Sequence, residues 1–288
     1  MAPVTQMFAW LSRMPLSWMQ RVGAVLGWLV WALSPRYRQH FKANVQAAKV
    51  PWHDARPAIA AMGMMVAELP WVWMRSNSQP LGDVVRWDGA AHFEAAMQTG
   101  KGVIVMSPHL GCWEIGAQAI AEKFGPRFGP LVALYRPARK AWLEPLVAQA
   151  RTRSYLASAP TSLAGVRTLI RTLRAGGYTA ILPDQVPPLG QGVWAPFFGR
   201  EVYTMTLLSK LAQQTGAAVI LTWCERLAPG QGFCIHMRPF EAHELRDPDC
   251  SPEQAAAAVN RGVEAMVRAA PGQYLWSYAR DKQPRVEG

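Results

Sequence analysis

The chain has 288 residues, of which 50% are hydrophobic and 17% are charged, so it can form one large core or two smaller ones. This composition excludes a disordered protein, a collagen-like fibre and a coiled coil, and the lack of any charge-free apolar run of about 18 residues excludes a polytopic membrane protein. Lys and Arg together number 30 against 19 Asp and Glu, and the net charge of +11 predicts an anionic partner: nucleic acid, a phospholipid surface, or an acidic protein or substrate.

The first fifty residues combine positive charge with a short apolar segment. No acidic residue precedes Asp54, and residues 22–33 form an uninterrupted apolar run. This run is short for a membrane span and typical of a helix in the membrane interface; counting from Leu16 past Arg21 gives a marginal span. A buried core helix is the alternative. Since no small-x-small cleavage site follows, a secretory signal is disfavoured.

Tryptophan supports a lipid interface, because eight of the 13 Trp residues fall in the first hundred positions. We therefore predict that residues 1–50 form helices that attach to the membrane, with Trp18, Trp28 and Trp31 at the interface and basic side chains facing anionic headgroups. A second apolar stretch, 58–74, is rich in Met and Trp. Its helical spacing is more typical of a core helix than of lipid contact.

Residues 51–288 are predicted to form a single α/β domain. Short apolar runs predict strands at 84–87, 102–107, 131–135, 178–182, 217–223 and 233–237. Between and after them, helices are predicted at 90–98, 113–124, 141–151, 163–174, 205–214 and 252–269. This alternation indicates a mainly parallel central sheet flanked by helices. The carboxyl ends of parallel strands then share one edge, where such sheets bind ligands.

The cysteines give no sign of a metal site or a disulfide framework. Cys112, Cys224, Cys234 and Cys250 make no C-x-x-C pair, and their spacing relative to the six His residues matches no zinc site. We expect reduced thiols in a reducing compartment, and no metal.

The strongest candidate for chemistry follows the predicted strand 102–107. His109 leaves this strand, Gly111 permits a tight turn, and Glu114 lies in the first turn of the next helix. Across such a junction the two side chains can converge, and a carboxylate on one ring nitrogen leaves the other nitrogen free as a base. An ordinary polar loop with a satisfied histidine is the alternative, because H-x-x-x-x-E alone is a weak signal.

Other catalytic motifs are missing from the sequence. There is no G-x-S-x-G, H-E-x-x-H or P-loop, and the G-x-G-x-x-A pattern at 190–195 lies between prolines instead of opening a helix. A histidine base without a paired nucleophile favours direct attack by a substrate hydroxyl on an activated acyl group.

An ordered set of segments resembles the late acyltransferases of lipid A biosynthesis (lauroyl/myristoyl type), which carry the H-x4-D/E motif of glycerolipid acyltransferases. The segments are an arginine-containing N-terminal apolar helix followed by R-Y-R at 36–38, H-L-G-C-W-E at 109–114, Y-R-P at 135–137, D-Q at 184–185, F-F-G at 197–199 with Thr204, and Q-Y-L-W at 273–276 with Arg280 and Lys282. Cys112 stands where the family usually has Asn, and Asp281 where an aromatic residue is usual.

The resemblance implies an acyltransferase that moves a fatty acyl chain from acyl carrier protein to a hydroxyl of a lipid A precursor, an anionic glycolipid, at the cytoplasmic face of the bacterial inner membrane. His109 would be the general base and Glu114 its partner, with no covalent acyl-enzyme. No cofactor is implied beyond the phosphopantetheine arm of the carrier protein. The acidic carrier and the anionic acceptor both suit a chain of charge +11.

Further residues are candidates for binding, each with a structural alternative. Arg136 and Arg139 would clamp phosphate or form a solvated loop. Asp184 and Gln185 would hold acceptor hydroxyls or order a loop. Three arginines on one face of the predicted helix 163–174 would dock the carrier protein or simply be solvated; they are Arg167, Arg171 and Arg174.

The aromatic pair Phe197 and Phe198 would line an acyl channel or pack on the core. The resemblance adds Arg280 to the substrate-binding candidates.

Two other functions stay open at the level of sequence. One is acyl transfer to a different lipid, such as a lysophospholipid or glycolipid, and the other is a non-catalytic basic membrane-binding protein. Nucleic acid is disfavoured, because the basic residues coincide with an apolar, Trp-rich segment.

Overall fold

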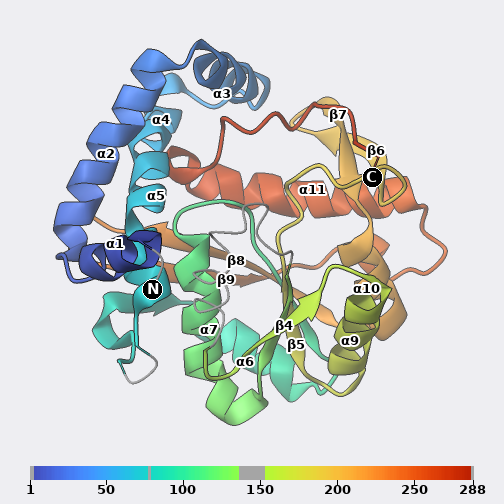
Figure 1. Cartoon of the computed structure of the whole chain (residues 1–288). Coiled ribbons are helices and arrows are strands. Elements are labelled where there is room, and N and C mark those ends of the chain that lie inside the picture. Colours follow the sequence, from blue (N-terminus) through green and yellow to red (C-terminus); the bar gives the residue numbers. More distant parts are fainter. Residues whose placement is uncertain (1–2, 77–78, 136–152, 287–288) are drawn as a thin grey trace.

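A seven-stranded sheet forms the centre of the molecule. The computed structural model of the chain describes residues 3–76, 79–135 and 153–286. The strands are β1 (Val85–Asp88), β2 (Val103–Met106), β3 (Leu131–Tyr135), β4 (Leu156–Pro160), β5 (Tyr178–Ile181), β8 (Ala218–Arg226) and β9 (Phe233–Pro239). Their order across the sheet is β1-β9-β8-β2-β5-β3-β4, and of these neighbours β8 and β9 alone pair antiparallel. Figure 1 shows β4, β5, β8 and β9 of this sheet at the centre of the molecule. The predicted mainly parallel sheet is confirmed.

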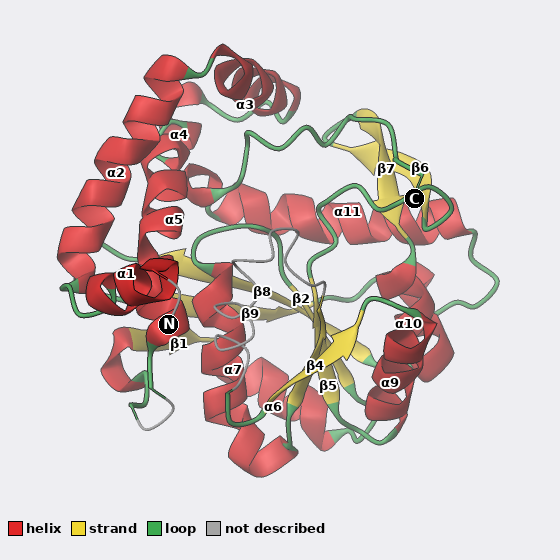
Figure 2. Ribbon diagram, viewed as in Figure 1, coloured by secondary structure: helices red, strands yellow, loops and turns green. Residues whose placement is uncertain are grey.

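Helices cover both faces of this sheet (Figure 2). One face carries α6 (Ala90–Gln98) and α7 (Trp113–Phe128), and the other carries α9 (Leu163–Arg174), α10 (Leu207–Thr215) and α11 (Pro252–Ala269). The side chains of β2 alternate accordingly: Val103 and Val105 join the core under α7, while Ile104 and Met106 join the core under α11. All four are buried, as expected for a central parallel strand.

Five helices precede the sheet: α1 (Pro3–Leu11), α2 (Leu16–Leu33), α3 (Pro35–Ala47), α4 (Trp52–Ala55) and α5 (Ala58–Met74). Helix α2 ends and α3 begins at Ser34 and Pro35 for a local reason. Ser34 has extended backbone and its hydroxyl accepts from the Tyr37 amide, while Pro35 takes the first helical position, where a missing N–H costs nothing.

The apolar helices α2 and α5 lie against each other as an antiparallel pair. Their backbones touch at glycines: a Cβ on Gly63 would lie 2.0 Å from the Gly23 carbonyl oxygen and 2.4 Å from the Gly27 nitrogen. Larger side chains would keep the helices apart, so these three glycines set the spacing of the pair. The predicted core role of 58–74 agrees with this packing, since eight residues of α5 are buried.

A buried polar cluster joins this pair to the sheet. Gln20 of α2 donates to Glu68 of α5 over 2.8 Å, and Glu68 accepts two 2.7 Å bonds from Arg226 at the end of β8. The predicted boundary at residue 50 stays a prediction, but residues on both sides of it share this cluster.

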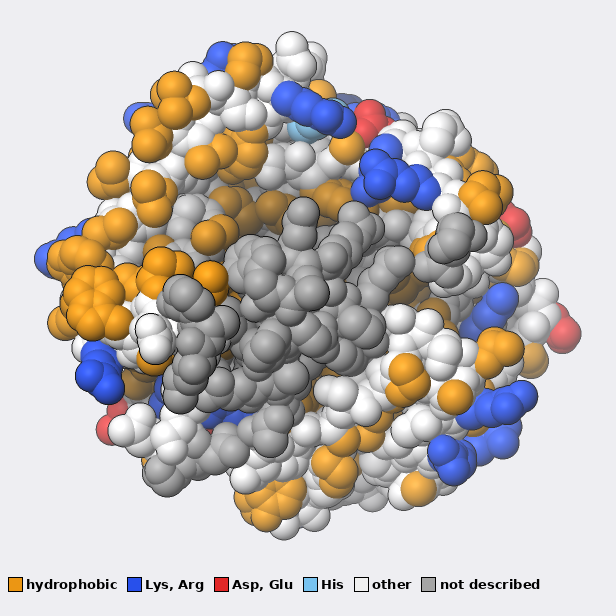
Figure 3. All heavy atoms as spheres, viewed as in Figure 1, with side chains coloured by type: hydrophobic (Ala, Val, Ile, Leu, Met, Phe, Trp, Pro, Cys, Tyr) orange, Lys and Arg blue, Asp and Glu red, His pale blue; other side chains and the backbone are white. Residues whose placement is uncertain are grey.

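The outer face of α2 is apolar and exposed. Val25, Leu29 and Leu33 are 68%, 50% and 72% exposed, and orange side chains gather over α1 and α2 in Figure 3. By length and composition, one helix of the described residues could cross a membrane, and it is Trp52–Met74 rather than α2; 44% of its apolar window is buried in the protein.

Two parts of the chain differ from the sequence-based expectations. Strand β4 was not predicted, because its segment L-A-S-A-P is short and weakly apolar. The segment after Asp184 forms an antiparallel hairpin, β6 (Gly192–Phe197) and β7 (Arg200–Met205), where a loop was expected and where the predicted helix 205–214 would begin. The predicted helix 141–151 lies outside the described residues.

Candidate active site

The loop between β2 and α7 has a conformation that requires glycine. Gly111 has φ of +64°, and a Cβ there would lie 1.9 Å from the carbonyl oxygen of Cys224. The loop is held at several points: Gly111 donates to the Gln273 carbonyl over 3.0 Å, Cys112 donates to the Cys224 carbonyl over 2.9 Å, and Leu275 donates to the His109 carbonyl over 3.0 Å. His109 is therefore presented from a rigid turn.

Asp184 holds the ring of His109. Its Oδ1 lies 2.7 Å from His109 Nδ1, and its Oδ2 accepts from the His109 backbone amide over 2.9 Å. The fold explains this meeting, because β2 and β5 are neighbouring parallel strands and each residue follows the carboxyl end of its strand. Asp184 is 3% exposed.

The free edge of the imidazole faces Gln185 and Trp113. When Nδ1 carries the ring proton and donates it in the hydrogen bond to Asp184, Nε2 is an acceptor, and the side-chain nitrogen of Gln185 lies 3.1 Å from it. The Trp113 ring packs edge-on at 5.0 Å between centroids. Nε2 is the nitrogen left available for a proton from substrate.

Burial and the neighbouring carboxylates shift the pKa of His109 in opposite directions. Burial lowers the pKa of His109, but the carboxylate of Asp184, through charge and hydrogen bond, and the charge of Glu114 more than compensate, so the pKa is raised above 6.5. Burial likewise raises the pKa of Asp184, but the His109 charge and hydrogen bonds and the charge of Arg280 outweigh it, and the net shift is downward. Asp184 is thus kept ionised.

Glu114 does not take the position that the sequence predicted for it. Instead of accepting from the imidazole, its Oε2 accepts from the indole Nε1 of Trp73 in α5 over 3.0 Å. His109 and Glu114 lie in the same turn of the chain, but the carboxylate that contacts Nδ1 of His109 is Asp184, which follows the neighbouring strand β5. The signal for Asp184 was available, since it follows the next strand along the same edge; the sequence could not show which carboxylate the ring would face.

None of the four cysteines is paired in a disulfide in the described structure, and two of them lie behind the loop. Cys112 and Cys224 are buried, and burial raises the pKa of both thiols well above its usual value. A raised pKa favours the protonated thiol over the thiolate form that a nucleophile needs. Among the described residues, no group of three His, Cys, Asp or Glu side chains could hold a metal ion.

Other predicted binding residues lie in the core. Phe197 and Phe198 are 4% and 7% exposed and belong to the core cluster that also contains side chains of α11. Arg280 is 2% exposed; it donates to the Tyr203 carbonyl over 2.5 Å and to the Thr204 hydroxyl over 3.0 Å. In this structure Arg280 supports the β6–β7 hairpin and contributes positive charge near Asp184, without reaching an open surface.

The remaining candidates are on the surface or outside the described residues. Three arginines are exposed on α9: Arg167, Arg171 and Arg174. Arg136 and Arg139 lie outside the residues that the structure describes.

The sequence matches known proteins along nearly its whole length. Residues 4–283 match the family model described as bacterial lipid A biosynthesis acyltransferase. The chain is 28% identical to the lipid A biosynthesis lauroyltransferase of Escherichia coli K12 over 236 residues, which cover 79% of this chain and 70% of that protein. It is 28% identical to the palmitoleoyltransferase of the same organism over 77% of this chain and 69% of that protein, and 30% identical to a lipid A biosynthesis acyltransferase of Haemophilus influenzae over 65% and 56%. The chain therefore belongs to the bacterial lipid A biosynthesis acyltransferases.

Proposed function

We propose that this acyltransferase moves a fatty acyl group from a thioester on acyl carrier protein to a hydroxyl of a lipid A precursor, at the cytoplasmic face of the inner membrane. The observation that carries the proposal is the 2.7 Å contact between His109 Nδ1 and Asp184, which leaves Nε2 as a base at the edge of the sheet. Family membership supports a lipid A type acceptor.

The reaction needs one base and one orienting carboxylate. The acceptor hydroxyl takes the place of the Gln185 amide at Nε2 and gives its proton to His109 as its oxygen attacks the thioester carbonyl. Asp184 fixes the tautomer and stabilises the imidazolium. The tetrahedral intermediate then expels the thiolate, which takes the proton from His109. No acyl-enzyme forms, and the buried, protonated thiols of Cys112 and Cys224 are consistent with this.

Glu114 has a supporting role in this proposal. Its charge raises the pKa of His109, although Asp184 has the larger effect. Its hydrogen bond to Trp73 also ties α7 to the end of α5, so the catalytic loop is fixed to the N-terminal helices.

The donor would approach from the side of α9. No acidic residue occurs between Glu144 and Asp184, and Figure 3 shows Lys and Arg side chains gathered over the lower right of the molecule, where α9 and α10 lie. The exposed arginines of α9 suit an acidic carrier protein, whose phosphopantetheine arm would bring the thioester to His109. No other cofactor is needed.

The test is an assay with purified protein, acyl carrier protein thioesters of several chain lengths and a tetra-acylated lipid A precursor, read by mass spectrometry. We expect an ester product with the wild type and a loss of at least about 1000-fold with His109→Ala. His92→Ala, an exposed histidine on α6, is the matched control. Full activity of folded His109→Ala would refute the mechanism. If a lysophospholipid supplied beside the lipid A precursor were acylated and the precursor were not, the proposed acceptor would be wrong.

A further inference from the structure

The side chain of Gln185 meets the base nitrogen of His109. Its amide nitrogen lies 3.1 Å from His109 Nε2, and because Nδ1 donates to Asp184, the amide is the donor in this contact. The His109 side chain is 16% exposed and Gln185 is half-buried, so a substrate can reach both groups. The amide nitrogen carries two N–H groups, and only one of them can point at the lone pair of Nε2.

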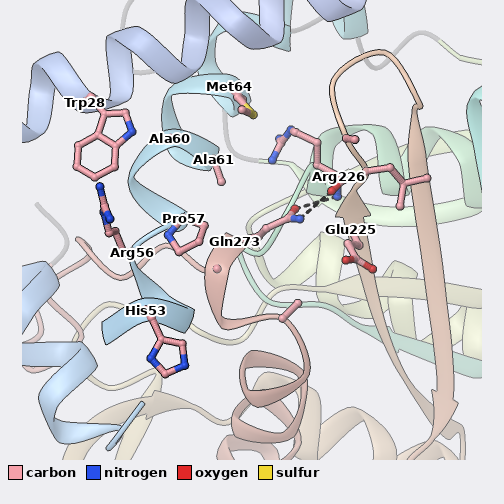
Figure 4. Close-up of a pocket in the computed structure, with 14 residues that line it drawn as sticks. Trp28, His53, Arg56, Pro57, Ala60, Ala61, Met64, Glu225, Arg226 and Gln273 are labelled. Carbon is pink, nitrogen blue, oxygen red and sulfur yellow. Dashed lines mark hydrogen bonds between the residues drawn. The ribbon is translucent and has the colours of Figure 1, made fainter. Parts of the chain in front are cut away.

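The turn that carries His109 is fixed from behind. Gly111 donates to the Gln273 carbonyl, and the side-chain amide of Gln273 exchanges two 2.8 Å hydrogen bonds with the backbone of Arg226, which Figure 4 shows. The side chain of Gln185, by contrast, makes no hydrogen bond in the described part of the chain other than the one to His109. When an acceptor hydroxyl binds at Nε2, the group that gives way is therefore the Gln185 side chain.

The backbone on both sides of Gln185 is held in place. Asp184 is fixed by its two contacts with His109, and the Val186 amide donates to the Tyr278 hydroxyl over 2.9 Å. The side chain of Gln185 can therefore turn about its own bonds while its backbone keeps it beside Nε2.

The reaction creates a negative charge close to this amide. As the acceptor oxygen bonds to the thioester carbon, its proton passes to His109 Nε2, and an electron pair of the C=O bond moves to the carbonyl oxygen. This oxyanion and the attacking oxygen are bonded to the same carbon, so the oxyanion forms next to the place that the amide held. The backbone amides of residues 109–112 all donate to other groups, which are Asp184, Pro108, Gln273 and Cys224 in that order. These four residues therefore have no backbone donor left for the oxyanion.

We infer that Gln185 is a catalytic residue that donates a hydrogen bond to the oxyanion of the tetrahedral intermediate. This inference rests on the proposed function, because it needs a thioester carbonyl that is attacked beside His109. The amide turns away from Nε2 as the hydroxyl enters, and it donates to the carbonyl oxygen as charge develops there. When the C=O bond reforms, the C–S bond breaks and the departing thiolate takes the proton from Nε2; the amide gains and loses no proton. A donor directed at a charge that exists only in the intermediate lowers the barrier without tightening substrate binding.

The first test compares the kinetics of Gln185→Leu with those of the wild type. Leucine is of similar size but has no donor, and Gln98→Leu, at an exposed position of α6, is the matched control. Rates are measured on the alkaline plateau of the pH profile, where His109 is neutral in each protein. We expect kcat to fall about 100-fold to 1000-fold in Gln185→Leu, as for other lost oxyanion donors, while KM for donor and acceptor changes less than about threefold. Gln98→Leu should behave like the wild type.

A second donor substrate shows which atom the amide serves. In a dithioester the carbonyl oxygen of the donor is replaced by sulfur, which is a weak hydrogen-bond acceptor. The wild type then loses the contribution of Gln185, whereas Gln185→Leu has none to lose. The ratio of wild-type to variant kcat should therefore be at least about tenfold smaller with the dithioester than with the thioester.

Three results would each show that the inference is wrong. They are an undiminished kcat in Gln185→Leu, a raised KM for the acceptor with kcat unchanged, which would make Gln185 an acceptor-binding residue, and an equal kcat ratio for thioester and dithioester. Failure of the proposed function has a different outcome, because the wild type itself would then form no ester with the lipid A precursor.

Discussion

In the proposed mechanism, the protonation state of His109 decides when the enzyme can act. A base must be neutral, so activity falls as the pH drops through the pKa of the imidazole. Because Asp184 and Glu114 raise this pKa above 6.5, the acid limb of the pH profile should lie above 6.5 as well. The pH at which activity falls therefore measures the net effect of burial and of these two carboxylates on the pKa of His109.

Replacing Asp184 by Asn removes the larger of the two carboxylate effects. We expect kcat/KM to fall about 100-fold to 10,000-fold, because the neutral amide no longer stabilises the imidazolium or fixes its tautomer. The acid limb should also move to lower pH, since burial then lowers the pKa of His109 with less opposition. A pH–rate profile of kcat/KM checks both effects, and an unmoved limb would contradict the assignment.

Glu114→Gln tests the second carboxylate. The amide oxygen can still accept from Trp73, so the fold should be preserved, and the limb should shift in the same direction but less than in Asp184→Asn. If Glu114→Gln shifted the limb further than Asp184→Asn, then Glu114 would be the main partner of the ring, as the sequence suggested.

At the scale of elements, the pair α2 and α5 depends on close backbone contact. Gly63→Val would place a branched side chain where even a Cβ lies 2.0 Å from the Gly23 carbonyl oxygen. We expect the free energy of unfolding, measured by denaturant titration, to fall by about 1–3 kcal/mol. Val66→Ala, at a position of α5 that is 66% exposed, is the control and should cost little. Equal stability of both variants would show that the helices can separate without cost.

Helix α9 supplies the second element-scale prediction. Its three arginines follow at i, i+4 and i+7 and so span about 10 Å along one face. Replacing all three by Glu should raise KM for acyl carrier protein thioesters at least about tenfold, because the helix would then repel an acidic partner instead of attracting it. KM for a small acyl-pantetheine thioester should not change. If both donors were affected alike, the helix would matter for folding or for the acceptor instead.

Viewed as a whole, the molecule separates two kinds of surface. Figure 1 shows α1 and α2 on one side and α9 and α10 on the opposite side. The first side is apolar with exposed Trp, and the second is basic without acidic residues in α9 or α10. Under the proposed function, this separation would let a membrane contact one side while an acidic carrier protein contacts the other.

The apolar side is predicted to bind membranes through the outer face of α2. Leu29→Glu together with Leu33→Glu places two charges on exposed positions, so the fold should survive while flotation with anionic vesicles falls at least about tenfold. Leu163→Glu, at a position of α9 that is 78% exposed, is the control and should float like the wild type. Unchanged flotation of the double variant would mean that another surface attaches the protein. These substitutions are a cleaner test than removing residues 1–34, because that deletion would also remove Gln20 from the buried cluster with Glu68.

The sequence by itself determined the features that depend on local pattern. Apolar runs alternating with helices predicted the parallel sheet, and the turn around Gly111 predicted that His109 would leave a strand end; both hold because periodicity and turn chemistry act over a few residues. The ordered motifs also identified the family, now supported by the match over residues 4–283.

Only the tertiary structure decided which side chains contact one another in the folded chain. The strand order placed β5 beside β2, and with it Asp184 instead of Glu114 on the ring of His109. The same packing buried Phe197, Phe198 and Arg280, and turned α2 into a helix that lies along α5 with its apolar outer face exposed. These outcomes depend on which distant segments meet in space, and the spacing of residues along one chain carries no direct record of that.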